Sequence, residues 1–123
     1  MSSRIVASVL QLIIGIGLLN VWLIRRQAST SYRGGSAQSL REEFAAYGLP
    51  VAMFYVVGAL KIVSGIVLIA GVWFRLPVAL AAAVVAVLMV GALAMHMKVK
   101  DPVVKTVPAV VMLVLCVALL IVR

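Results

Sequence analysis

The stretch SLREEFAAYGLPVAMFYVVGALKIVSG, residues 39–65, decides how this chain is organised. A short polar segment leads through a Gly-Leu-Pro turn into an apolar run that extends to Phe74. About 20 helical residues, each rising about 1.5 Å, cross a hydrocarbon core of roughly 30 Å. The stretch therefore predicts a short helix that turns directly into a membrane-spanning helix.

Lys61 lies near the middle of that apolar run. A cation at the centre of a bilayer costs about 2.5–3.5 kcal/mol on insertion scales. The side chain could extend to a head-group layer. It could instead pair with Glu42 or Glu43 of the short segment, or with Gln11 of the first apolar run. It could also face a polar cavity and bind an anionic or carbonyl-bearing ligand, such as a lipid phosphate or a quinone oxygen. An ionisable residue inside a span is by default a candidate functional site, so Lys61 is the centre of the predicted site.

Glycines flank Lys61 on its own helix face. Gly58 and Gly65 lie three and four residues from Lys61, and these spacings return to one side of a helix. Small residues let neighbouring helices approach closely in a membrane. We therefore include Gly58 and Gly65 in the candidate site.

The short segment is predicted to form an amphipathic helix over about residues 40–47. Phe44 and Tyr47 have the spacing to share one apolar face with Leu40. Glu43 lies toward the N-terminal end, where the helix dipole favours negative charge. Such a helix lies on the membrane interface or dips into it. Tyr47 is expected to anchor there, and it joins the two glutamates in the candidate site.

Cap and turn signals delimit this interfacial helix. Ser39 and Glu42 have the spacing of a capping box, in which a hydroxyl and a carboxylate each satisfy a free backbone N–H. Gly48 fits the left-handed position that ends a helix. Pro50 is preorganised to begin the next helix. We expect Ser39, Gly48 and Pro50 to be structural residues.

The composition indicates a membrane protein. Of the 123 residues, 66% are hydrophobic and 11% are charged, which leaves too few polar residues to cover a soluble domain. Lysine and arginine outnumber aspartate and glutamate by 11 to 3, for a net charge of +8. Because the basic residues fall between apolar runs, we expect them to face anionic lipid head groups and not nucleic acid.

Four apolar runs predict an all-α polytopic membrane protein: one domain, an antiparallel four-helix transmembrane bundle with the interfacial helix between its first two spans. Gln11 and Trp22 share one face of the first span, which suits a polar contact inside the bundle. Asp101 and Pro102 are interpreted as the N-cap and first residue of the last span, and Pro108 predicts a kink within it. The expected spans cover about residues 5–24, 50–74, 77–96 and 102–122.

The distribution of basic residues predicts an orientation. Seven lysines and arginines lie beside the two longer loops, whereas Arg4, Arg75 and Arg123 lie on the other side. This excess places both longer loops in the cytoplasm and both termini outside. We expect the membrane to be a bacterial cytoplasmic membrane.

Motifs for chemistry are few. Asp101 follows His96 by five residues and could fold back to meet it, which predicts a contact that ties the turn together. One histidine and one aspartate are too few ligands for a metal site. Cys116 is the single cysteine, so an intramolecular disulfide is excluded. With no nucleophile–base pair, phosphate-binding loop or facing carboxylates, we predict no catalytic residue, metal or resident cofactor.

Three stretches occur in the order and spacing of a known family: YRGGSAQSLREEFAAYGLP, VGALKIVSGIVLIAGVWF and LMVGALAMHMKVKDPVVKTVPA. Together they cover about residues 30–110 and resemble the DoxX-like family of small four-span membrane proteins. The family is named after a subunit of a thiosulfate–quinone oxidoreductase, and most members have no established reaction. A eukaryotic branch similar to this family assists the assembly of membrane receptors.

The resemblance implies positions for the residues that recur in the family. Its intramembrane ionisable position on the second span falls on Lys61, where other branches carry glutamate. Its entry into that span, the end of its third span and the following turn fall on Glu43, Phe44, Tyr47, Gly48, Leu49, Pro50, Met89, Gly91, His96, Asp101, Pro102, Lys105 and Pro108.

Three hypotheses for the function remain open. The leading one is a non-enzymatic membrane protein that binds a lipid-like or other hydrophobic ligand, a partner membrane protein, or a second copy of itself around Lys61. The resemblance implies an alternative, an accessory membrane subunit of a quinone-linked oxidoreductase, for which a partner must supply the electron carrier. The third hypothesis is a small ion or proton conductor.

Overall fold

The computed structural model describes residues 3–24 and 39–123. Four segments in these ranges are long and apolar enough to cross a membrane. The predicted all-α fold with four spans is therefore confirmed. The helices are α1, Ser3–Leu19, continued by a π-helical turn, Asn20–Ile24; α2, Leu40–Ala46; α3, Val51–Ala70; α4, Val78–Lys98; and α5, Val107–Val122, preceded by a 3-10 turn, Val103–Thr106.

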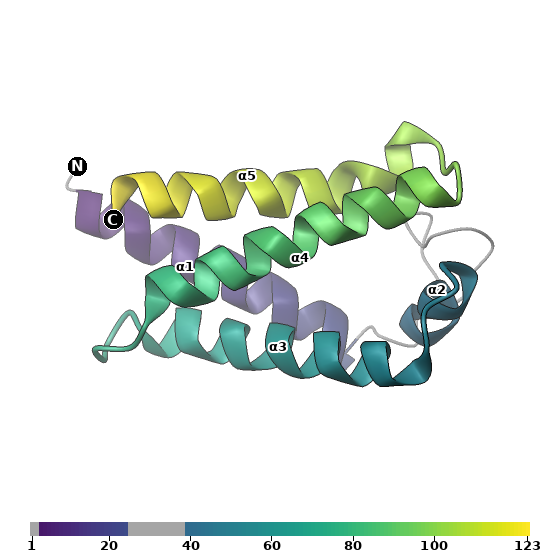
Figure 1. Cartoon of the computed structure of the whole chain (residues 1–123). Helices are drawn as coiled ribbons and strands as arrows, with labels where there is room; N and C mark the ends of the chain where they lie inside the picture. The colour runs from purple at the N-terminus through teal and green to yellow at the C-terminus, as the bar shows by residue number, and fades with distance from the viewer. Residues whose placement is uncertain (1–2, 25–38) are drawn as a thin grey trace.

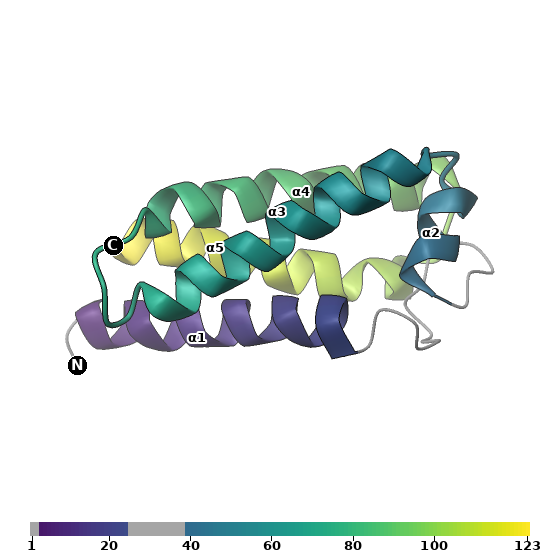
Figure 2. The same ribbon diagram turned by 90° about the horizontal axis from the view of Figure 1, so that it is seen from below.

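The four long helices form a ring in which each packs against two neighbours (Figures 1 and 2). α1 lies against α3 and α5, and α4 lies against the same two helices from the other side. Both termini and the α3–α4 turn lie at one end of the bundle, called the terminal end below. α2 and the connection between α4 and α5 lie at the opposite end, called the α2 end (Figure 1).

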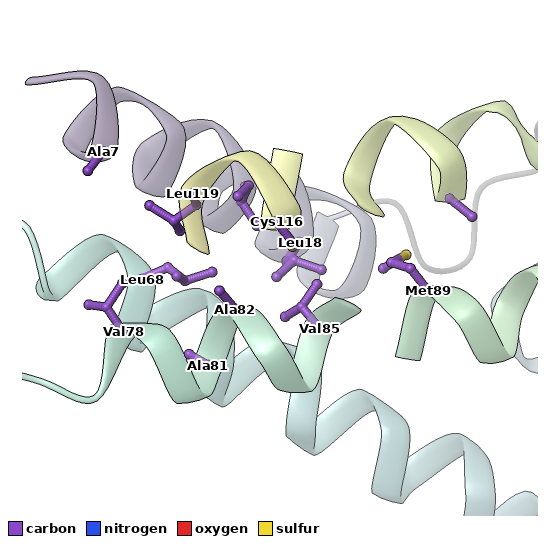
Figure 3. Close-up of a cluster of buried hydrophobic side chains, with 12 residues drawn as sticks. Ala7, Leu18, Leu68, Val78, Ala81, Ala82, Val85, Met89, Cys116 and Leu119 are labelled. Atoms are coloured by element: carbon purple, nitrogen blue, oxygen red, sulfur yellow. The ribbon is translucent and has the colours of Figure 1, made fainter. Parts of the chain in front are cut away.

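Apolar side chains face both the interior and the exterior of the bundle. Ile13, Val63, Val87 and Ile121, one from each long helix, are at least 50% exposed. Apolar residues on every side of a helix are typical of a helix in hydrocarbon. The interior is filled by small and branched side chains (Figure 3): Ala7, Ile14, Leu18, Leu68, Val78, Ala81, Ala82, Val85, Met89, Ala109, Cys116 and Leu119.

α1 and α3 touch where one glycine faces another. A Cβ atom at Gly15 would lie 2.8 Å from the carbonyl oxygen of Gly65 and 2.5 Å from a side-chain carbon of Ile69. A Cβ atom at Gly65 would lie 3.3 Å from the carbonyl oxygen of Gly15. The prediction that Gly65 lets a neighbouring helix approach closely is confirmed.

The ends of α3 and α4 differ from the predicted ones. α3 ends at Ala70 and not at Phe74. The chain turns back at Gly71, and a Cβ atom there would collide with a methyl group of Val78 at the start of α4. The early turn therefore places α4 directly against the end of α3. α4 in turn extends beyond His96, to Lys98.

The start of the last span also requires correction. Pro102, and not Asp101, occupies the N-cap position of the 3-10 turn, and it makes no side-chain cap bond. The carboxylate of Asp101 is bound by His96 instead. α5 begins only at Val107, so Pro108 lies in its first turn, where the missing N–H removes no helical hydrogen bond. A 3-10 turn followed by an α-helix thus replaces the kink expected at Pro108.

Candidate functional site at the α2 end

Caps at both ends of α2 direct it into α3. The Ser39 hydroxyl accepts the N–H of Glu42 at 3.2 Å and donates to the Glu42 carboxylate at 3.3 Å, which confirms the N-cap. Gly48 has a φ of 77°, and the backbone around it closes a Schellman motif. Pro50 then occupies the N-cap position of α3. The direct turn from the short helix into the second span is as predicted.

An aromatic cluster fixes α2 against α3 and against the π-helical turn that follows α1. The ring centroids of Trp22, Phe44 and Phe54 lie 5.3–6.0 Å apart. Trp22 and Phe54 are buried, and Phe44 is partly buried against them. Each such ring pair contributes about 0.5–1.5 kcal/mol beyond the burial of its area. The cluster therefore sets the position of the polar residues on α2.

The Trp22 ring covers Gly58 and faces Lys61. A Cβ atom at Gly58 would lie 2.6 Å from a carbon of the indole, so only glycine admits the ring at this place. The Lys61 ammonium nitrogen lies 5.4 Å from a Trp22 ring centroid, within the roughly 6 Å range of a cation–π contact. Gly58 thus contributes to the site by making room for the side chain that holds Lys61.

Lys61 is half-buried, and its contacts do not fully satisfy its ammonium group. Glu43 on α2 attracts it electrostatically. Among the described residues, Lys61 donates no hydrogen bond. A desolvated cation–π contact contributes about 2 kcal/mol, whereas a cation at mid-span costs about 2.5–3.5 kcal/mol. The described contacts therefore offset much of the cost but leave the N–H donors of Lys61 available.

A chain of polar side chains, called the polar chain below, runs from α2 to the start of the last span. The Tyr47 hydroxyl donates to Glu43 Oε1 at 2.6 Å and lies 3.4 Å from His96 Nε2. His96 Nδ1 lies 2.7 Å from Asp101 Oδ2, and Lys105 Nζ lies 3.8 Å from Asp101 Oδ1. The side chains of Tyr47 and His96 are buried. The polar chain therefore joins α2, α4 and the 3-10 turn inside the protein.

The geometry of the polar chain constrains its protons. His96 Nδ1 must donate to the Asp101 carboxylate, because a carboxylate only accepts. The Tyr47 hydroxyl gives its single proton to Glu43, so toward His96 it can only accept. The 3.4 Å contact is then a hydrogen bond only when both ring nitrogens carry protons. The predicted contact of His96 with Asp101 is confirmed, while its extension to Tyr47 could not be predicted from the sequence.

Lys98 also contributes to this end of the bundle, although its sequence position indicated only that it is one of the seven basic residues beside the longer loops. Its ammonium donates to the Tyr47 carbonyl oxygen at 2.8 Å. A cation at the last carbonyls of a helix satisfies them and complements the helix dipole. Lys98 therefore fastens the C-terminal end of α2 to α4. The signal available in the sequence was its position two residues after the predicted end of the third span.

Four of the seven predicted site residues lie near one another, and the other three do not. Glu43, Tyr47, Gly58 and Lys61 come together at the α2 end. Glu42 is exposed and bonds to its own N-cap, because adjacent helical residues point about 100° apart. Gly65 packs against Gly15 farther along α3.

Gln11 does not reach Lys61. Its amide nitrogen donates to the Leu68 carbonyl oxygen at 3.0 Å, and its oxygen accepts from Arg123 Nη1 at 3.3 Å. α1 and α3 are antiparallel, so the chain position beside Lys61 belongs to Trp22, three turns after Gln11. The predicted polar contact of Gln11 inside the bundle exists, but its partner is not the lysine.

A scan against protein-family models matches residues 27–119 to the DoxX-like family. The chain belongs to this family. Searches of curated proteins and of solved structures gave no match. Family membership and the four spans together identify an integral membrane protein.

The matched region of this DoxX-like protein contains most of the α2 end. Lys61 and the whole polar chain lie inside residues 27–119, whereas Trp22 precedes them in the π-helical turn after α1. No group of three or more His, Cys, Asp or Glu side chains that could hold a metal occurs within residues 3–24 and 39–123.

Proposed function

We propose that this DoxX-like protein is a non-enzymatic binding protein that holds the anionic or carbonyl-bearing head of a lipid-like ligand beside Lys61. One observation carries the proposal. The ammonium group lies halfway along α3, is positioned by the Trp22 ring and donates no hydrogen bond among the described residues. An ammonium offers three donors, and unsatisfied donors are costly in a membrane. An oxygen of a bound ligand would accept them.

The neighbours of Lys61 limit the charge of that ligand. Glu43 lies near enough to attract the ammonium, and it is held in place by the Tyr47 hydroxyl. A second negative charge close to Glu43 would be repelled in this poorly solvated region. These contacts favour a head group with one negative charge, or a neutral carbonyl group, over a multiply charged one.

Native mass spectrometry from a mild detergent tests the proposal. The wild-type chain should retain a lipid-like adduct, and Lys61→Met should lose it, because methionine keeps most of the side-chain length but removes the donors. Lys100→Met is the matched control, since Lys100 is exposed in the turn after α4. Equal adducts in both variants would contradict the proposal. A protein partner or second copy that is lost only with Lys61→Met would assign the surface around Lys61 to a protein instead of a lipid.

The polar chain supports a second candidate, the accessory subunit of a quinone-linked oxidoreductase. Reduction of a quinone to a quinol takes up two protons with two electrons, and the buried contacts of Tyr47, His96 and Asp101 could pass protons. The electrons would come from a partner subunit. Co-purification of a redox subunit, with quinone-dependent protection of the α2 end from proteolysis, would favour this candidate. Absence of both effects would reject it.

A further inference from the structure

A pocket of about 700 Å³ lies at the terminal end of the bundle, away from Lys61, which is halfway along α3. Its walls are the first turns of α1, the α3–α4 turn over residues 71–76, and the end of α5. These are the segments that meet where both termini lie in Figure 1. No sequence motif predicted this pocket, because it is assembled from three separate parts of the chain.

Three arginines line this pocket: Arg4 on α1, Arg75 in the turn and Arg123 after α5. The described lining of the pocket includes no aspartate or glutamate. Among the described residues, the guanidinium groups of Arg4 and Arg75 have no ion-pair or hydrogen-bond partner. Three cations that face one cavity repel one another unless an anion lies between them.

Gln11 gives the pocket a fixed inner wall. Its side chain is only 2% exposed, and its amide nitrogen is anchored on the Leu68 carbonyl oxygen. Its amide oxygen accepts from Arg123 at 3.3 Å and so orients that guanidinium. A buried amide that bonds to both the helix backbone and an arginine is a built feature and not a chance meeting of surface side chains.

The mouth of the pocket suits an amphiphile. Trp73 and Phe74 line it and are 69% and 68% exposed. Aromatic rings of this kind favour the head-group level of a membrane. The arginines therefore lie at the depth where lipid phosphates occur, with apolar surface beside them for an acyl chain.

From these observations we propose that the terminal-end pocket binds a phosphate-type oxyanion, carried by a phospholipid head group or present as the free ion. Guanidinium groups match phosphate oxygens in geometry and bond to them in pairs. Arg4, Arg75 and Arg123 hold the oxyanion, and Gln11 positions Arg123. The site is independent of the one beside Lys61, because it lies away from Lys61, at the terminal end of the bundle.

Tryptophan fluorescence can measure this binding directly. The chain has two tryptophans, so Trp22→Phe leaves Trp73 as the sole reporter, and binding beside Lys61 then gives no tryptophan signal. The protein in neutral detergent is titrated with short-chain phosphatidylglycerol, with short-chain diacylglycerol and with inorganic phosphate. Phosphatidylglycerol should give a saturable change in Trp73 emission, and diacylglycerol should not. A matching response to inorganic phosphate would identify the free ion as a sufficient ligand, whereas a response to phosphatidylglycerol alone would identify the head group.

Variants of the arginines test whether binding in the terminal-end pocket causes the change in Trp73 emission. Arg4→Gln and Arg75→Gln should each weaken binding about tenfold or more, the loss typical of a charged hydrogen bond. Both side chains are exposed, so these variants should fold, which circular dichroism can check. Arg41→Gln on α2 removes the same charge at the other end and should bind like the parent. Equal binding by all three variants, an equal response to diacylglycerol, or no saturable response to either phosphate-bearing probe would overturn the proposal.

Discussion

Replacing Gly15 with alanine should separate α1 from α3 and destabilise the fold, whereas the same replacement at Gly91 should not destabilise it. At Gly15 the added methyl group would lie 2.8 Å from the Gly65 carbonyl oxygen and 2.5 Å from Ile69. The carbonyl oxygen is part of the backbone, so relief requires the helices to move apart. At Gly91 the same group would meet nothing within 4 Å.

Two opposing effects determine how much each replacement changes the free energy of unfolding. Alanine favours a helix over glycine by about 0.5–1 kcal/mol, and this gain applies at both positions. Overpacking in a close contact costs about 1–3 kcal/mol, and this loss applies only at Gly15. We therefore expect Gly15→Ala to lower the free energy of unfolding by about 1–2 kcal/mol. Gly91→Ala should leave it unchanged or raise it by up to about 1 kcal/mol.

Unfolding in mixed micelles of increasing sodium dodecyl sulfate fraction measures this difference. Helix content by circular dichroism and tryptophan emission, to which the buried Trp22 contributes, should report one transition. Both variants are compared with the wild type in the same detergent. Equal midpoints for Gly15→Ala and Gly91→Ala would refute the reasoning, because they would mean that α1 and α3 are not in the close contact described.

Three further predictions concern single side chains. Gly48→Ala should destabilise the fold by roughly 1–2 kcal/mol, because φ is 77° there; an unchanged unfolding midpoint would argue against the left-handed turn. Tyr47→Phe should lower the free energy of unfolding by about 1–3 kcal/mol in the same titration, because Glu43 and His96 both lose a buried partner. An unchanged free energy of unfolding would mean that water replaces the hydroxyl. Cys116 is fully buried, so a maleimide should label it only after unfolding, as mass spectrometry can show; fast labelling of the folded protein would contradict the core packing.

The spans and the α2–α3 turn could be predicted because their signals are local. Apolar runs of membrane length identify α1, α3, α4 and α5 whatever their neighbours are. Ser39, Gly48 and Pro50 act on the backbone within a few residues of themselves. The contact of His96 with Asp101 was also predictable, since only five residues separate them.

Register between helices could not be predicted from such signals. Gln11 was one of the partners that the sequence left open for Lys61, because both are polar residues inside spans. In the antiparallel pair of α1 and α3, however, Gly15 faces Gly65. This register places Gln11 beside Leu68 and Trp22 beside Gly58. The two facing glycines held the needed information, but the sequence alone does not say which glycine of α3 meets which glycine of α1. The same limit applies to the terminal-end pocket, whose three arginines come from three distant segments.

The position of α2 decides how Lys61 is compensated. Phe44 binds into the aromatic cluster, and this orientation turns Glu43 inward while Glu42 remains exposed at the N-cap. Only one of two adjacent glutamates can face the lysine, and that one also accepts a hydrogen bond from Tyr47. Lys61 is therefore attracted to the Glu43 carboxylate, which already accepts a hydrogen bond from Tyr47. The Lys61 ammonium also lies over the Trp22 ring, which accepts no conventional hydrogen bond. A fully paired lysine would point to a structural role, and an isolated lysine would not remain in a span. The described contacts of Lys61 lie between these two cases, and the ligand contact that we propose rests on this partial compensation.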